Sequence, residues 1–318
     1  MRHNMNKTIL TLIISIIFLG TAAAAPHKTT YLYAEKDGEK LYLDHYHSSV
    51  KGERGCVVFL FGGAFVGGVR DNEAYNDYFE FLTREGWDVV SIDYRLGLKP
   101  MTQSDMQPTL RETIGLLYNA VNIAVEDLYS ATLFILDNAD RWSIDPEKIV
   151  ISGSSAGAIT VLQAENELCN HGELATVLPE GFRYAGVISF AGAIFSVSGE
   201  PQWAEKPAPI MFFHGNSDQQ VPYKKATLLG VGFYGSNYLV SQFNKLDVPY
   251  WFYMVKYGTH DLAVTPMRNN LAHIREFLKS FVLAGEHSQR TTEVSDTAFP
   301  KRPTSFDVKD YISANYGN

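Results

Sequence analysis

Short apolar runs rich in Val, Ile, Phe and Tyr alternate along the chain with longer stretches of helical periodicity. The run Cys56–Phe61 reads CVVFLF, so it has no polar position on either face. A strand of this kind is typical of a parallel sheet that helices cover on both sides. We predict strands over Lys40–Tyr46, Cys56–Phe61, Asp88–Ile92, Lys148–Ser152, Ala185–Phe190, Ile210–His214 and Tyr250–Val255.

Helical periodicity is clearest between Ile114 and Ile135, where apolar residues recur every three or four positions along one face. We predict this long helix and four others, over Asn72–Arg84, Ser155–Leu168, Gly235–Leu246 and Pro266–Leu283. Alternating strands and helices predict an α/β protein with three layers, in which helices cover both faces of a mostly parallel sheet of about eight strands. The alternating pattern of Lys40–Tyr46 leaves an antiparallel strand open.

The N-terminus has the order of residues of an export signal. Arg2 and Lys7 precede the apolar run Ile9–Leu19, and small residues follow as far as Ala25. The run is short for a membrane span, which needs about 20 apolar residues. We therefore expect a signal peptide over 1–25, cleavage near Ala24 or Ala25, no membrane span in the mature chain, and a secreted or periplasmic location. An uncleaved anchor is the alternative.

Composition narrows the class of protein further. The chain has 318 residues, a net charge of −8 and 46% hydrophobic residues, which fits a globular protein with a large core. The acidic balance argues against a nucleic-acid partner, which needs a concentrated basic surface. The two cysteines, Cys56 and Cys169, fit either a disulfide or two buried thiols.

The segment Gly153-Ser154-Ser155-Ala156-Gly157 carries the strongest chemical signal. It follows the strand KIVIS and precedes a predicted helix, which is the context of a G-x-S-x-G nucleophile elbow. The two glycines permit the close backbone approaches of a sharp strand-to-helix turn. The pattern predicts Ser155 as a nucleophile, with the N–H of Ala156 facing a developing oxyanion. A turn in which the serine only caps the helix is the alternative.

A second turn of small residues, FGGAF over residues 61–65, follows the CVVFLF strand. Consecutive small residues let the chain turn with its N–H groups toward a ligand, although a tight turn without function has the same pattern. Beside a nucleophile elbow, this turn predicts an oxyanion hole formed by the N–H groups of Gly63, Ala64 and Ala156. We expect Phe65 to contact the substrate.

Two further loops supply a carboxylate and an imidazole. Asp218 ends the segment HGNSD after one predicted strand, and His260 lies in YGTHD after the last one. Among nine histidines, His260 alone combines a place after the last strand, a neighbouring glycine and the chain order Ser155, acid, base. We predict Asp218 as the acid that orients this base, with Asp261 as its rival. We interpret His214 as a packed residue at a strand end.

These motifs resemble those of α/β-hydrolases of the carboxylesterase type. In pattern the chain is similar to small bacterial acetylxylan and feruloyl esterases and to dienelactone-hydrolase-like enzymes. The resemblance spans about Leu41 to Val282, and it includes DYR over residues 93–95 and WSIDP over residues 142–146. It implies the α/β-hydrolase fold and, in DYR, an Arg or Asp that braces the loops near the site. The irregular segment Ile194–Pro209 is too short for a large lid. The oxyanion turn departs from the family's HGGG form, because Phe61 replaces the His and Ala64 the last Gly, which puts its bracing hydrogen bonds in doubt.

Two other features, a pair of histidines and a tryptophan, have both a structural and a functional interpretation. His45 and His47 lie on one face of a strand, but a metal site needs at least one more ligand. We therefore interpret this strand as a solvated edge strand and expect no metal. Trp203 lies in the irregular segment Ile194–Pro209, where we expect it to contact the substrate.

The resemblance and the predicted triad together imply an exported serine esterase that needs no cofactor. Export and the resemblance together favour small-molecule or oligosaccharide esters as its substrates, namely acetyl or feruloyl groups on plant polysaccharides. We expect a catalytic domain over 26–284 and a polar surface tail over 285–318, and we leave open that Phe306, Tyr311 and Ile312 dock back on the domain. The oligomeric state is not predicted. A serine peptidase of related fold and an inactive binding module on a hydrolase scaffold are the alternatives.

Overall fold

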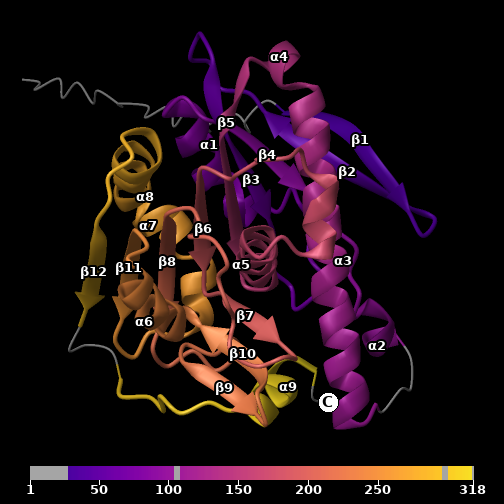
Figure 1. The fold of residues 1–318 in the computed structure, drawn as a ribbon, viewed down its shortest axis with the longest axis vertical. Helices are drawn as coiled ribbons and strands as arrows, with labels where there is room; N and C mark the ends of the chain where they lie inside the picture. Colours follow the sequence, from indigo (N-terminus) through magenta and orange to yellow (C-terminus); the bar gives the residue numbers. More distant parts are fainter. Residues whose placement is uncertain (1–27, 104–107, 296–299, 317–318) are drawn as a thin grey trace, which may run out of the picture.

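A nine-stranded sheet forms the centre of the molecule (Figure 1). The computed structural model describes residues 28–103, 108–295 and 300–316. In sheet order, the strands are β1 (Lys28–Lys36), β2 (Glu39–Tyr46), β4 (Asp88–Ile92), β3 (Arg54–Leu60), β5 (Ile144–Ser154), β6 (Gly186–Phe190), β8 (Ile210–Gly215), β11 (Tyr250–Val255) and β12 (Gln289–Val294). β2 runs antiparallel to both of its neighbours, and all other pairs are parallel. The predicted α/β class and mostly parallel sheet are confirmed.

Helices cover both faces of this sheet. The helices α3, α5 and α6 pack on one face, while α1, α7 and α8 pack on the other (Figure 1). The helices are α1 (Asn76–Arg84), α2 (Lys99–Gln103), α3 (Leu110–Asp137), α4 (Ala139–Trp142), α5 (Ala156–Cys169), α6 (Ser236–Leu246), α7 (Pro266–Asn269), α8 (Leu271–Phe277), α9 (Val308–Tyr316), the 3-10 helices η1 (Glu73–Tyr75), η2 (Glu173–Val177) and η3 (His260–Ala263), and the π-helix η4 (Leu278–Leu283). The predicted helix over Pro266–Leu283 is thus three consecutive short elements.

The continuous apolar runs form the inner strands, as their patterns predict. Every residue of β6 and β8 is buried. Successive side chains of a strand point to opposite faces, so Phe212 packs toward Phe243 of α6 while Phe213 stacks on Phe190 and faces the other layer. The sheet is therefore a rigid support, and the loops at the carboxyl ends of its strands are held in place.

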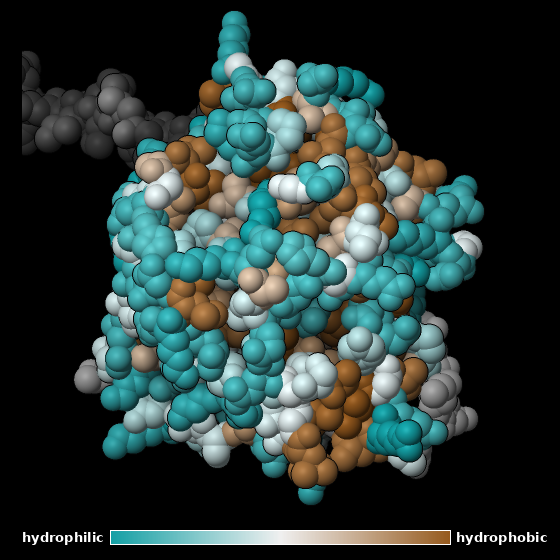
Figure 2. Space-filling model, in the orientation of Figure 1, coloured by the Kyte–Doolittle hydropathy of each residue, from teal (hydrophilic) through white to brown (hydrophobic). Residues whose placement is uncertain are grey.

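A second, three-stranded antiparallel sheet lies beyond these carboxyl ends, in the order β7 (Ala193–Ser196), β10 (Val231–Gly235), β9 (Lys225–Leu228). Its β9–β10 turn exposes Leu228 and Leu229, the latter to 98%. Figure 2 shows apolar surface at this lower end of the molecule. The sequence analysis did not predict this sheet, because its strands are short.

The C-terminal region differs from the polar surface tail that the sequence suggested. β12 adds a strand to the main sheet beside β11, and its burial alternates between half-buried and exposed positions, which explains its polar sequence. Helix α9 packs on the molecule through Tyr311, one of the residues for which docking was left open: it is buried with its ring 4.0 Å from that of Phe233. The last element of the main sheet therefore lies after residue 284.

The predicted signal peptide, residues 1–25, lies outside the described residues. Within the described part of the chain, no helix combines the length and apolar character needed to cross a membrane. Cys56 and Cys169 are both buried free thiols.

Candidate active site

Ser155 occupies a sharp turn between β5 and α5. Its backbone has φ 51° and ψ −115°, which an L-residue adopts only under strain. The flanking glycines make this turn possible: a Cβ on Gly153 would lie 2.2 Å from the carbonyl oxygen of Gly157, and one on Gly157 would lie 2.2 Å from that of Leu60. No larger side chain fits at either position. The turn therefore has the geometry of a nucleophile elbow.

Three side chains from separate loops meet at this turn. The Nε2 atom of His260 lies 2.8 Å from Oγ of Ser155, and its Nδ1 atom lies 2.8 Å from Oδ2 of Asp218. The loops follow β5, β8 and β11, whose carboxyl ends lie at one edge of the sheet. The structure thus brings together the three residues that the sequence singled out, 105 and 42 positions apart from His260 along the chain.

Asp218 is held in a buried, ionised state. Its Oδ1 atom accepts hydrogen bonds from the backbone N–H groups of Gln220 and Val221, at 2.8 and 2.9 Å. Burial alone would raise the pKa of Asp218, but the imidazoles of His260 and His214 reverse this effect and hold the pKa well below its usual range. A carboxylate of this kind fixes the tautomer of His260 and stabilises its protonated form.

The rival acid, Asp261, has another role. Its Oδ1 atom accepts a hydrogen bond from the backbone N–H of Thr259 at 3.1 Å and a second from the hydroxyl of that residue. Asp261 therefore caps the turn that carries His260, and the contact to the imidazole belongs to Asp218.

His214 is fully buried, as its interpretation as a packed residue implies, but it also contacts the acid. Its Nε2 atom lies 3.3 Å from Oδ2 of Asp218 and 3.2 Å from the carbonyl oxygen of Val221. Both of these oxygens accept hydrogen bonds, so Nε2 carries a proton. Its Nδ1 atom lies 2.8 Å from the hydroxyl of Ser236 at the start of α6. The sequence showed only that a histidine ends the strand before the acid.

The turn over residues 61–65 lies against the elbow. A Cβ on Gly62 would lie 3.1 Å from Cβ of Ser155. Two tyrosine hydroxyls brace the turn: that of Tyr94 donates to the carbonyl oxygen of Phe61 at 2.8 Å, and that of Tyr75 accepts from the N–H of Gly62 at 3.3 Å. Tyr94 belongs to the DYR segment, so the tyrosine of this segment braces the turn, whereas the resemblance implied its Arg or Asp. These two hydroxyls hold the turn although Phe61 stands where the family has a histidine.

Two expected substrate contacts are wrong. Phe65 is fully buried and packs edge-on against Tyr94, so it belongs to the core. Trp203 packs against Phe243, and its neighbour Gln202 accepts a hydrogen bond from Asn166 near the end of α5. Because Ser155 precedes the start of this 14-residue helix, Trp203 lies toward the opposite end, roughly 20 Å along the helix axis.

The segment before α9 crosses the loops that carry the acid and the imidazole. Arg302 donates a hydrogen bond to the carbonyl oxygen of Tyr257 at 3.1 Å, close to His260 in sequence. Its own carbonyl oxygen accepts from the hydroxyl of Ser217 at 3.5 Å, next to Asp218. A cavity of about 280 Å³ lies between this segment and the loop after β8. The C-terminal region therefore forms part of the wall around the acid.

Comparison with known proteins identifies solved structures of similar fold. No protein-family model matches the chain. The apo form of esterase 2 from Thermogutta terrifontis superimposes with a TM-score of 0.58 at 20% identity, over 84% of this chain and 98% of that one. The same enzyme phosphonylated by sarin gives 0.59 at 19% identity, over 80% and 95%, and its propionate-bound form gives 0.57 at 20%, over 80% and 94%.

A curated relative, esterase B1 from Culex pipiens, is 27% identical over 109 residues. This match spans 33% of the chain and 18% of esterase B1, so it covers about a fifth of that protein's length. The superpositions over most of the chain show that it shares the α/β-hydrolase fold of Thermogutta terrifontis esterase 2.

Proposed function

We propose that this chain is a serine esterase in which Ser155, His260 and Asp218 form the catalytic triad. The observation that carries the proposal is the unbroken contact from the Ser155 hydroxyl through both nitrogens of His260 to the Asp218 carboxylate. Ser155 is half-buried and the His260 side chain is 14% exposed, so a substrate reaches both. The esterase names of the proteins with a similar fold agree with this activity.

The first half of the reaction acylates the serine. Nε2 of His260 takes the proton from Oγ of Ser155 as the oxygen attacks the ester carbonyl, and Asp218 stabilises the imidazolium that forms. The oxyanion of the tetrahedral intermediate accepts hydrogen bonds from the N–H groups of Ala156, Gly63 and Ala64. Each such donor contributes on the order of 10²–10³ in rate. The intermediate collapses when His260 gives its proton to the alcohol, which leaves.

The second half repeats the sequence with water. His260 takes a proton from the water as its oxygen attacks the acyl-enzyme, and a second tetrahedral intermediate forms in the same oxyanion hole. His260 then returns this proton to Oγ of Ser155, and the carboxylic acid is released. The chain's own groups thus supply the nucleophile, the acid–base function and the charge stabilisation of a complete ester hydrolysis.

We propose acetyl or feruloyl esters of plant polysaccharides as the substrates, and an exported location for the mature protein. The N-terminal charged, apolar and small residues support export. The propionate-bound form of Thermogutta terrifontis esterase 2 supports a short acyl group by analogy.

A panel of substrates tests both levels of the proposal. The panel comprises p-nitrophenyl acetate and butyrate, acetylated and feruloylated xylan oligosaccharides, a long-chain triglyceride and a p-nitroanilide amide. We expect release of acetate or ferulate from the oligosaccharides, with the Ser155→Ala variant as the inactive control. Exclusive hydrolysis of the triglyceride would reject the substrate class, and preference for the amide would favour the peptidase alternative. No turnover of any ester would reject the activity itself.

A further inference from the structure

A cluster of two imidazoles and one carboxylate lies at the end of the sheet opposite the elbow. His45 is near the end of β2, and Asp88 is the first residue of β4, which β2 contacts in antiparallel register. The elbow follows the carboxyl end of β5. Asp88 lies at the amino-terminal end of β4, and β4 and β5 are both parallel to β3 between them. The cluster and the elbow therefore lie at opposite ends of the strands. The prediction of a solvated edge strand here is wrong, because β1 pairs with β2 and His45 is fully buried.

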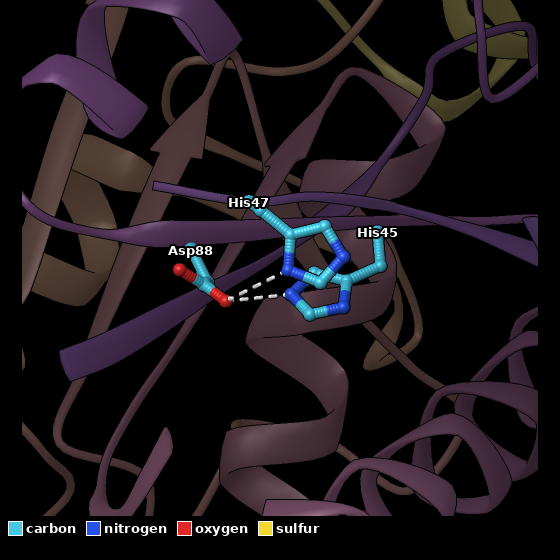
Figure 3. A group of neighbouring side chains, drawn as sticks. All are labelled: His45, His47 and Asp88. Carbon is cyan, nitrogen blue, oxygen red and sulfur yellow. Dashed lines mark hydrogen bonds and ion pairs between the residues drawn. The ribbon is translucent and has the colours of Figure 1, made fainter. Parts of the chain in front are cut away.

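The three side chains aim one atom each at a common point. Figure 3 shows both imidazoles turned toward the same carboxylate oxygen of Asp88. Nε2 of His45 lies 2.6 Å from Oδ2 of Asp88, and Nδ1 of His47 lies 3.9 Å from it. All three ligand atoms lie within 4.8 Å of one another. Asp88 is the additional ligand that the two histidines required.

These separations are close to those around a tetrahedral zinc ion. Zinc binds imidazole nitrogen and carboxylate oxygen at about 2.0–2.2 Å, so two ligand atoms on a tetrahedron lie about 3.3 Å apart. The observed distances of 2.6 and 3.9 Å lie on either side of this value. Changes of about 0.6–0.7 Å bring these two separations to 3.3 Å, and water would complete the coordination. The His47 side chain is 39% exposed, which gives the ion a path from solvent.

The other carboxylate oxygen is held in place from outside the cluster. Oδ1 of Asp88 accepts hydrogen bonds from the backbone N–H of Ser48 at 3.0 Å and from Nε of Arg54 at 2.8 Å. These two hydrogen bonds fix the orientation of the carboxylate, so that Oδ2 faces the two imidazoles. Outer partners of this kind orient a metal ligand.

We propose that a zinc ion binds to His45, His47 and Asp88. This ion links β2 to β4 at the end of the sheet away from Ser155. Zinc binds the neutral imidazole through Nε2, so the proton that lies between Nε2 of His45 and Asp88 moves to Nδ1 of the same ring. The imidazole is held for this purpose between the ring of Trp142, at 4.2 Å between centroids, and that of His47, at 3.7 Å. The inference does not depend on the proposed esterase activity.

Titration with Zn²⁺ tests the site directly. Tag-free protein is treated with EDTA, dialysed and titrated by calorimetry, and its Tm is followed against Zn²⁺ concentration. The main variant is His47→Ala, because this side chain is half-exposed and its loss leaves the core intact. His171→Ala is the matched control, since His171 is 68% exposed and pairs with Glu205 elsewhere on the surface.

We expect one zinc ion per chain and a Tm that rises with Zn²⁺ concentration. Loss of even an outer partner of a metal ligand costs about 10–100-fold in affinity, so His47→Ala should weaken binding at least about tenfold. His171→Ala should bind as the wild type does. Saturable binding that is equal in His47→Ala, or none below about 100 µM, about −5.5 kcal/mol, would overturn the proposal. Ester turnover is measured in parallel, and its loss or retention bears only on the triad.

Discussion

Nε2 of His214 lies 3.3 Å from Oδ2 of Asp218, the same oxygen to which His260 is bound. One carboxylate oxygen is thus held from two sides by imidazoles, while backbone N–H groups hold the other oxygen. His214 is fully buried and contacts Asp218, so it acts as a positioning residue for the acid.

This contact predicts that substitution of His214 changes kcat much more than KM. His214→Phe removes the donor to Asp218 and keeps an aromatic ring, so we expect kcat to fall about tenfold, since a hydrogen bond to a charged group is worth about 1.5–3 kcal/mol. KM should stay within about twofold, because the transition state rather than substrate binding needs the fixed acid. His214→Gln keeps an N–H donor and should restore most of kcat. Equal kcat in the wild type and the Phe variant, both verified as folded, would contradict the role.

Asp218 also links the site to stability in acid. Its pKa in the folded protein lies below the unfolded value of about 3.9, so ionised Asp218 stabilises the fold above that pH. This stabilisation is lost as the pH falls below about 4 toward the folded pKa. We expect Asp218→Asn to be less stable than the wild type at pH 7, and the gap to narrow below about pH 4. Urea unfolding across this pH range measures the difference in stability between the two proteins. A difference that does not change with pH would contradict an ionised Asp218 in the folded protein.

The glycine after the nucleophile allows a sharp structural prediction. A Cβ on Gly157 would lie 2.2 Å from the carbonyl oxygen of Leu60, so Gly157→Ala should push α5 away from β3 and lower both activity and Tm. Gly115→Ala is the matched control, because Gly115 lies in α3 with open space around its Cα. Alanine there should raise stability by about 0.5–1 kcal/mol. Thermal melts and turnover of a p-nitrophenyl ester separate the two cases, and an active Gly157→Ala enzyme would refute the geometric argument.

Much of the site was predictable from sequence because its parts have local signatures. The elbow needs glycines at fixed spacing, and the acid and base follow apolar strands that end at one sheet edge. The predictions that were wrong concern contacts between residues that lie far apart in the sequence. Nothing near Trp203 in the sequence shows that its loop runs back along α5, and nothing near His45 shows that Asp88, 43 positions away, faces it. β12 escaped prediction because an edge strand with a polar outer side lacks an apolar run.

The docked C-terminal helix gives a further prediction. Tyr311 is 1% exposed against Phe233, so Tyr311→Ala should destabilise the protein by about 3 kcal/mol, as for other buried aromatic residues. Tyr118→Ala provides the control, because Tyr118 is 42% exposed on α3 and its loss should change stability by less than about 0.5 kcal/mol. Denaturant titration measures both. Equal small effects would show that α9 does not depend on this contact.

A fluorophosphonate probe tests the central claim most directly, because only an activated serine reacts with it. After incubation of the wild-type protein and its His260→Ala variant, tryptic peptides are examined by mass spectrometry. The account predicts one adduct on Ser155 in the wild type and at least a hundredfold slower labelling without the imidazole, since general-base catalysis contributes about 10²–10⁴-fold. An unmodified Ser155, or labelling that does not change when His260 is removed, would contradict it.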